Sequence, residues 1–229
     1  MFKLSLLDEI QKQLVANRKS KLTAMGKKLQ KLDWQFVFTV SKCLGDSFND
    51  SSWRFLKGEV LNRAIELASH HELSYVDRKG CDFLFNNDVR IEAKTQQRFF
   101  LKKSPHHTLK NEIQIKNTMS IEQNFERTFD FLLLVQTSPP YIAALSDWVT
   151  VEENGKRTDG QIKIERILED DMFFITSEQG ISKPIEIEQE YLLRQKIVET
   201  LDGWLSEIKN KYEDESLLQN ELKKLLSEN

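Results

Sequence analysis

The hairpin-like stretch at residues 81–96, C-D-F-L-F-N-N-D-V-R-I-E-A-K-T-Q, is the feature that most constrains the fold. Val89, Ile91 and Ala93 alternate with polar residues, which is the two-residue period of a half-buried strand. The Asn86-Asn87 pair tolerates the positive φ that tight turns need. The sequence therefore predicts a β-hairpin with one apolar face. The opposite face carries Arg90, Glu92, Lys94 and Gln96.

The length of the turn decides whether Asp82 joins that charged face. A three-residue loop over 86–88 pairs Phe85 with Val89 and, counting back along both strands, places Asp82 opposite Glu92. A two-residue loop pairs Asp82 with Ile91 and turns its carboxylate to the other side, unless a bulge intervenes. Both registers remain open at this point.

Periodicity in the flanking segments predicts an α/β chain. Apolar residues at helical spacing predict a helix near the N-terminus and another over roughly 53–70, whereas the apolar run that begins at Trp34 fits helix or strand. Further expected elements are strands at 73–77, 81–85 and 88–95, a short helix at 120–129, strands at 129–136 and 141–146, strands within 161–176, and charged helices over the last forty or so residues. The middle of the chain thus has the order αβββαβ.

Composition sets the broad class and shows an uneven distribution of charge. With 229 residues, 39% of them hydrophobic, the chain can bury a core, and its formal net charge is −3. Six basic residues and no acidic one lie between Arg18 and Lys31, residues 90–116 are mainly basic, and the stretch after Pro184 is acidic. We expect one domain over 1–229. Its expected parts are a basic helical element at 1–50, a core at 53–146, additional strands at 147–185 and a helical element at 186–229.

Several classes of protein lack support in the sequence. Cys43 and Cys81 form neither a disulfide framework nor a zinc-type spacing. No apolar run is long enough for a signal peptide or a membrane span, so we expect a cytoplasmic protein without a membrane partner. Neither a glycine-rich phosphate loop nor a G-x-S-x-G motif occurs. The pattern at 106–111 is weakly HNH-like but lacks the ββα context of that motif.

The charged strand face suits metal chemistry. Asp82 and Glu92, if adjacent, repel each other unless a cation lies between them, and hard carboxylate oxygens suit Mg²⁺. Lys94 would stand beside that metal, in a position to orient a water or offset charge on a phosphate. Three other [D/E]-x-K matches, Asp77/Lys79, Glu207/Lys209 and Glu221/Lys223, fall in a turn or in expected helices. The alternative is a salt-bridged sheet face without catalysis.

The order αβββαβ, with Asp82 opening the second strand and Glu92-Ala93-Lys94 in the third, resembles the PD-(D/E)xK nuclease superfamily and most of all its type II restriction endonucleases. The resemblance covers roughly residues 55–146, and Cys81 stands where the family usually has proline. It implies a restriction-endonuclease-like core, a central mixed sheet flanked by helices, with helical N- and C-terminal extensions. It further implies Mg²⁺-dependent DNA hydrolysis that leaves a 5′-phosphate and a 3′-hydroxyl. Asp82, Glu92 and the backbone carbonyl of Ala93 would bind the metal, and Lys94 would be the catalytic lysine.

Two further residues are candidates for this site. Many family members carry an acidic residue on the first core helix, and Glu59 matches best, with Glu66 the weaker choice; an exposed helix carboxylate is the alternative. Gln96 shares the face of Glu92 and Lys94, where it could position substrate or Lys94.

The basic segment that follows the hairpin is the candidate DNA-binding element. We expect a loop here that contacts phosphates and base edges, with an ordinary surface loop as the alternative. The residues expected to contact double-stranded DNA are Arg98, Lys102, Lys103, Lys110, Asn111, Gln114 and Lys116. Because a two-fold symmetric DNA site is cut on both strands, we also expect a homodimer, with the apolar stripe of 190–208 as one possible interface.

The sequence thus predicts a Mg²⁺-dependent endodeoxyribonuclease of the type II restriction class. One rival is a repair or recombination nuclease of the same fold that reads DNA structure. A second rival, from a different class, is a nuclease-like fold that only binds nucleic acid or a protein partner.

Overall fold

The structure is a computed structural model, and it describes residues 2–47, 54–78, 81–97, 100–101, 108–116, 128–158, 161–167 and 171–176. The helices in these ranges are α1 (Phe2–Leu29), α2 (Trp34–Ser47), α3 (Arg54–Ala68) and α4 (Trp148–Asn154). The strands are β1 (Leu73–Arg78), β2 (Cys81–Phe85), β3 (Val89–Gln96), β4 (Phe100–Leu101), β5 (Thr108–Lys116), β6 (Phe131–Gln136), β7 (Ile142–Asp147), β8 (Gly155–Thr158), β9 (Gln161–Arg166) and β10 (Phe173–Phe174).

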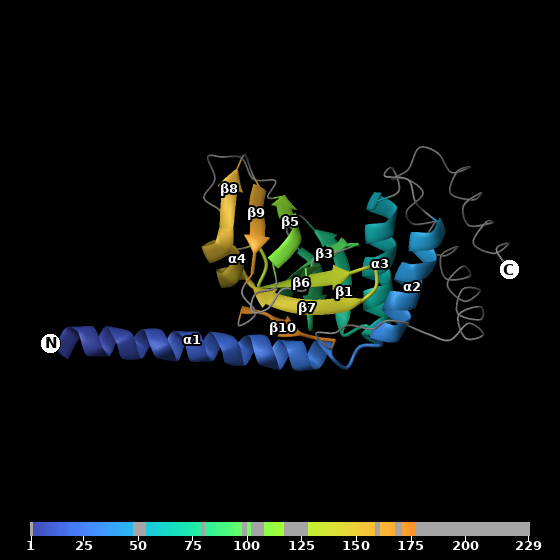
Figure 1. Cartoon of the computed structure of the whole chain (residues 1–229). Helices are drawn as coiled ribbons and strands as arrows, with labels where there is room; N and C mark the ends of the chain where they lie inside the picture. The colour runs from blue at the N-terminus through green and yellow to red at the C-terminus, as the bar shows by residue number, and fades with distance from the viewer. Residues whose placement is uncertain are drawn as a thin grey trace.

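The described strands form two sheets. The larger one is mixed, with six strands in the order β1-β2-β3-β6-β7-β10, and β3 and β6 form its parallel pair. The smaller sheet is antiparallel, in the order β4-β5-β9-β8. A mixed six-stranded sheet flanked by helices confirms the expected α/β class at this level (Figure 1).

Each face of the six-stranded sheet packs against a different layer. On one face, a large core cluster joins the sheet to α1, α2 and α3, and it includes Ile91 and Ala93 of β3. On the other face, Leu132 and Leu134 of β6 pack with α4 and β9 in a second cluster. Because side chains alternate along a strand, Glu92 and Lys94 point away from the layer that contains α3.

Helix α1 has two different halves. Its C-terminal half is anchored to the six-stranded sheet by buried Leu22, Met25 and Leu29. Close packing there requires Gly26, since a Cβ at that position would lie 2.1 Å from the Phe173 ring. The N-terminal half extends past the sheets in Figure 1, and Leu14 on it is 63% exposed. Neither α1 nor any other helix of the described ranges combines the length and apolarity needed to cross a membrane.

Most of the expected elements are confirmed, and the ambiguous run at Trp34 is a helix. Trp34, Val37 and Phe38 recur at helical spacing and are buried together. Asp33 accepts a hydrogen bond from the Phe36 amide (3.0 Å), which is an N-cap contact. The positive φ angles of Asn86 and Asn87, 51° and 62°, confirm the turn that the sequence predicts.

Two expectations were wrong in part. Residues 108–116 form strand β5 and not a loop, because the segment can pair along β9. The expectation of additional strands at 147–185 was incomplete: β8, β9 and β10 confirm it, but helix α4 precedes them, and Asp147 caps that helix by accepting a hydrogen bond from the Thr150 amide. The expected helix at 120–129 lies almost wholly outside the described residues, as do the C-terminal helices and the interface at 190–208.

Candidate functional site

The hairpin adopts the register that the site hypothesis requires. Phe85 pairs with Val89 and Phe83 with Ile91, so residues 86–88 form a three-residue loop. The Asp88 amide donates to the Phe85 carbonyl (3.2 Å) and closes the turn. Counting back along both strands, Asp82 lies opposite Glu92, on the face away from the large core cluster.

The carboxylate of Asp82 reaches across to β3. The last regular pair of the β2–β3 ladder is Phe83 with Ile91. Beyond it, Oδ2 of Asp82 accepts a hydrogen bond from the backbone amide of Ala93 (2.7 Å). An ionised acceptor makes a stronger bond than a neutral carbonyl, so this contact fixes the Asp82 carboxylate beside the Glu92-Ala93 peptide.

Glu92 and Lys94 form a close ion pair on the same face. Nζ of Lys94 contacts Oε1 of Glu92, two residues apart along β3. The Glu92 side chain is only 8% exposed, whereas that of Lys94 is 27% exposed. A buried carboxylate requires a cation or hydrogen-bond donors nearby, and Lys94 supplies the positive charge here.

The negative charges of both carboxylates affect the pKa of the Cys81 thiol. Burial raises the pKa of Cys81, backbone hydrogen bonds from Ile91 and at Phe83 lower it, and the negative charges of Asp82 and Glu92 raise it further. A thiol whose pKa is raised stays protonated and is a poor nucleophile. Cys81 is therefore a buried, unreactive residue beside the two carboxylates.

Gln96 continues the same face toward the end of β3. Its Oε1 is buried and has no hydrogen-bond partner among the described residues. Its neighbour in the parallel ladder, Gln136, donates through Nε2 to the Pro140 carbonyl (2.5 Å). A buried amide oxygen without a donor costs free energy, so Gln96 retains the capacity to accept a hydrogen bond from water or a ligand.

Glu59 does not join Asp82 and Glu92 in a cluster. It is 9% exposed on α3, the helix that packs on the opposite face of the sheet. Within the described ranges, no group of three or more His, Cys, Asp or Glu side chains is arranged to hold a metal ion. Two carboxylates, from Asp82 and Glu92, are thus the side chains that this site offers, and open positions would be left for water and substrate.

The expected DNA-contacting residues fall in two groups. Arg98, Lys102 and Lys103 lie outside the described residues. The others belong to β5, which pairs with β4 and β9 in the second sheet. They are Lys110, Asn111, Gln114 and Lys116, of which the structure describes the backbone. Their contact with DNA stays a prediction, with the correction that they occupy a strand.

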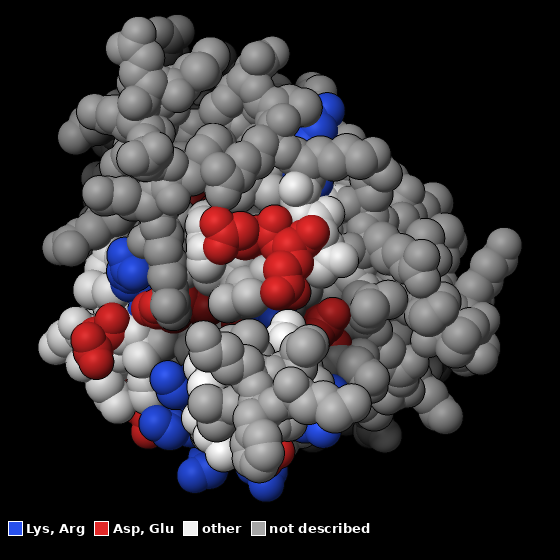
Figure 2. All heavy atoms as spheres, turned by 90° about the vertical axis from the view of Figure 1, so that its left-hand side faces the viewer, with Lys and Arg blue, Asp and Glu red and all other residues white. Residues whose placement is uncertain are grey.

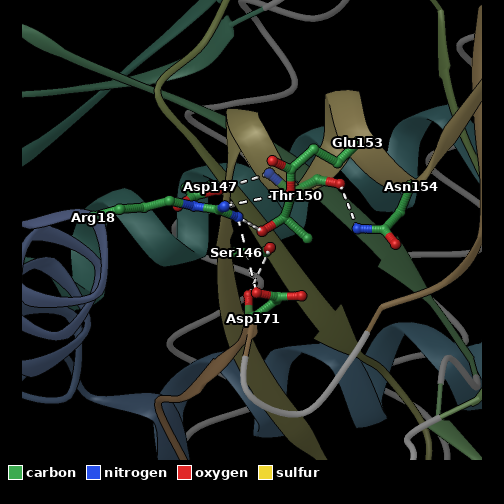
Figure 3. A network of polar contacts seen from close by, with 7 residues as sticks. All are labelled: Arg18, Ser146, Asp147, Thr150, Glu153, Asn154 and Asp171. Atoms are coloured by element: carbon green, nitrogen blue, oxygen red, sulfur yellow. Dashed lines mark hydrogen bonds and ion pairs between the residues drawn. The ribbon is translucent and has the colours of Figure 1, made fainter. Parts of the chain in front are cut away.

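A second polar cluster joins α1 to α4, and its residues were not singled out by the sequence (Figure 3). Nε of Arg18 pairs with Oδ2 of Asp147 at 2.5 Å, and Nη2 contacts Oγ1 of Thr150 and, at 3.9 Å, Oδ1 of Asp171. The Arg18 side chain is 22% exposed. We call the residues Arg18, Asp147, Thr150, Glu153 and Asp171 the Arg18 cluster. The only sequence signal for it was the capping potential of Asp147 ahead of α4.

Charge is unevenly distributed on the end of the molecule seen in Figure 2. Asp and Glu side chains gather near the middle of this face, and Lys and Arg side chains lie mostly toward its lower edge. Carboxylates gathered in this way attract cations and repel the phosphates of DNA.

Comparisons with protein-family models, with curated proteins and with solved structures found no match to this chain. Its function is therefore inferred from its own residues. The constellation that distinguishes it is the hairpin site, which we define as Asp82, Glu92, Lys94 and Gln96. It brings two carboxylates, an ammonium group and an unpaired amide oxygen to one face of the sheet.

Proposed function

We propose that the protein is a Mg²⁺-dependent endodeoxyribonuclease, of the type II restriction class with a restriction-endonuclease-like core. The observation that carries the proposal is the hairpin register. It places the Asp82 carboxylate at the Glu92-Ala93 peptide, with Lys94 beside Glu92. A carboxylate pair can hold a divalent metal ion for phosphodiester hydrolysis, and an adjacent lysine can offset charge on the phosphate.

The donor set fits a hard divalent cation. Asp82 and Glu92 would hold Mg²⁺ through carboxylate oxygens, and the carbonyl of Ala93 would add a third ligand. A metal ion held there would supply Lewis-acid activation of the phosphate and would lower the pKa of a bound water. The carboxylates of Asp82 and Glu92 come from neighbouring strands of a packed sheet, so the protein holds the two ligands in a fixed relation.

Lys94 and Gln96 provide the remaining polar groups. The Lys94 ammonium donates hydrogen bonds and carries the charge that offsets a developing negative charge on phosphate. Gln96 accepts a hydrogen bond through its unpaired Oε1 and so orients a water molecule or Lys94. Together, Lys94 would stabilise the negative charge that develops on the phosphate, and Gln96 would align a water molecule or Lys94.

The proposed substrate is double-stranded DNA, cut at a short specific sequence to leave a 5′-phosphate and a 3′-hydroxyl. Lysines of β5 and of the preceding segment would contact phosphates, and Asn111 and Gln114 would contact base edges. A homodimer would place two such sites across the two strands of the DNA.

Plasmid cleavage tests the proposal. Supercoiled DNA is incubated with the full chain and Mg²⁺ or EDTA, beside Asp82→Asn, Lys94→Gln and the control Asp88→Asn. Asp88 is an exposed carboxylate in the hairpin turn, so its variant makes the same chemical change outside the site. We expect discrete Mg²⁺-dependent bands from the parent and the control, and none from the other two variants.

Each of the other outcomes favours a different function or a different location of the active site. Smears or nicks that require Asp82 favour a repair or recombination nuclease that reads DNA structure. DNA retention without cutting in any metal favours a non-catalytic binding module, for which the Lys94–Glu92 ion pair would be an ordinary stabilising contact. Cutting that is equal in all variants places the active site elsewhere in the chain.

A further inference from the structure

We propose that Lys94 acts as a built-in counter-ion that holds the metal-binding carboxylate of Glu92 until a divalent cation displaces it. This inference rests on the proposed function, because it concerns how the same site is loaded. Lys94 thereby has two positions, one on Glu92 without metal and one turned toward the substrate with metal. The site is self-inhibited when it is empty.

The contact between the two side chains is the first step. Nζ of Lys94 touches Oε1 of Glu92, the oxygen-bearing end of a side chain that is 8% exposed. A carboxylate with so little access to solvent has few sites at which a second cation can bind. The positive charge of the ammonium group repels a divalent cation at this range, so Mg²⁺ competes with Lys94 for the Glu92 carboxylate.

The second step is the asymmetry between the two carboxylates. Asp82 accepts a hydrogen bond from the backbone amide of Ala93, which is fixed in the sheet. A carboxylate oxygen has lone pairs for a hydrogen bond and for a cation together. The backbone thus orients Asp82, whereas Glu92 is contacted by a movable side chain, that of Lys94.

The third step is the freedom of Lys94 to leave. Its side chain is 27% exposed and bears four flexible methylene groups, so its ammonium group can move into solvent while its stem stays on the sheet. Beyond it on the same strand lies Gln96, whose unpaired Oε1 offers an acceptor for a displaced ammonium group.

A Mn²⁺ titration followed by electron paramagnetic resonance tests this inference, because it measures binding without any turnover. The proteins compared are the parent, Lys94→Met, Asp82→Asn and the control Lys27→Met, all as full chains. Lys27 is an exposed lysine on α1, so its variant makes the same charge change away from the hairpin. Circular dichroism melts show that each variant is folded.

We expect Lys94→Met to bind Mn²⁺ more tightly than the parent by roughly tenfold or more, since a unit charge a few ångströms from a divalent cation repels it strongly. Lys27→Met should match the parent, and Asp82→Asn should bind more weakly. Equal or weaker binding by folded Lys94→Met overturns the inference. If Asp82→Asn still loses Mn²⁺ and cleavage, the proposed function stands. Equal Mn²⁺ binding by all four proteins would show that the metal does not bind at the hairpin site, and this result overturns both the inference and the proposed function.

Discussion

The hairpin site and the Arg18 cluster both gather carboxylates around one cation, but they are built differently. The hairpin site comes from residues 82–96 on two adjacent strands, and Lys94 pairs with Glu92 two residues away. The Arg18 cluster joins α1 to residues more than 125 positions later in the chain. One is a local surface of a sheet, and the other connects distant segments.

Their cations also differ in how firmly they are held. The Arg18 guanidinium contacts Asp147, Thr150, Glu153 and Asp171 through directed nitrogen atoms (Figure 3). The Lys94 ammonium is a compact charge on a flexible stem. Planar guanidinium groups suit fixed ion pairs, whereas a lysine exchanges partners readily. We infer that the Arg18 cluster stabilises the fold and that the hairpin site carries the chemistry.

The largest effect that separates the two regions is expected from Asp82→Asn. An asparagine oxygen can still accept the Ala93 amide, so the hairpin keeps its register. Loss of the ligand charge should lower Mg²⁺-dependent cleavage by about 10²- to 10³-fold or more, the scale of losing one group that stabilises the transition state. Initial rates on linear DNA and a thermal melt measure both properties. If Asp82→Asn lowered the melting temperature but left the cleavage rate unchanged, the hairpin site would have a structural role and not a catalytic one.

Arg18→Met should do the reverse. It leaves Asp147, Glu153 and Asp171 close together without their guanidinium partner. Because Arg18 is partly buried, we expect a loss of about 1–3 kcal/mol in the free energy of unfolding, between the values for exposed and buried pairs. Urea denaturation measures it. Cleavage per folded molecule should remain that of the parent, and a selective loss of cleavage would place Arg18 in the active site.

Substitutions at Asp147 distinguish the contribution of its helix-capping hydrogen bond from that of its ion pair with Arg18. Its Oδ1 accepts the Thr150 amide (2.8 Å), and its Oδ2 pairs with Arg18. Asparagine caps helices about as well as aspartate, so Asp147→Asn should lose only the ion pair, whereas Asp147→Ala should cost about 1 kcal/mol more. Chemical denaturation of both variants checks this. Equal losses would show that the cap contributes nothing.

The smallest expected effect is the pH dependence at Asp171. Burial raises the pKa of Asp171, Arg18 lowers it, Glu153 and Asp147 raise it, and Lys19 lowers it, with a net rise above 3.8. A carboxyl whose pKa is raised on folding stabilises the protein below the unfolded pKa, and this contribution is lost as pH rises through the folded pKa. Ionised Asp171 therefore disfavours the fold near neutral pH.

Asp171→Asn removes that penalty. We expect the variant to be more stable than the parent at pH 7 by a few tenths of a kcal/mol, after allowance for solvent screening. The difference should shrink as pH falls below about 4, where Asp171 becomes protonated in both states. Thermal melts across this pH range measure the difference. A gain that persisted unchanged at low pH would assign it to packing and not to charge.

The local parts of the fold were predictable from the sequence for physical reasons. Alternation in β3 and the turn residues Asn86 and Asn87 determine the hairpin, because period and turn length together fix the register. The run at Trp34 was ambiguous because short apolar runs fit helix and strand alike. β5 was missed although Leu109, Ile113 and Ile115 fall on one face of a strand, because Asn111 interrupts the apolar alternation and the segment is highly charged.

The candidate site was predictable only where it is local. Asp82, Glu92 and Lys94 lie on one hairpin, so their proximity followed from strand geometry. Glu59 was chosen through helix position, and which face of a sheet a helix covers depends on long-range packing that one sequence does not encode in its periodicity. The Arg18 cluster was missed for the same reason, because no local pattern links Arg18 to Asp147.

Iron-directed cleavage of the polypeptide tests most directly whether Asp82 and Glu92 hold the metal. Fe²⁺ replaces Mg²⁺, and ascorbate with hydrogen peroxide then generates hydroxyl radicals that cut the backbone near the bound ion. We predict cuts in β2 and β3 close to Asp82 and Glu92, suppressed by excess Mg²⁺ and absent in Asp82→Asn. Cuts that map to Asp147 and Asp171 instead, and that persist in Asp82→Asn, would contradict the assignment of the metal site to the hairpin.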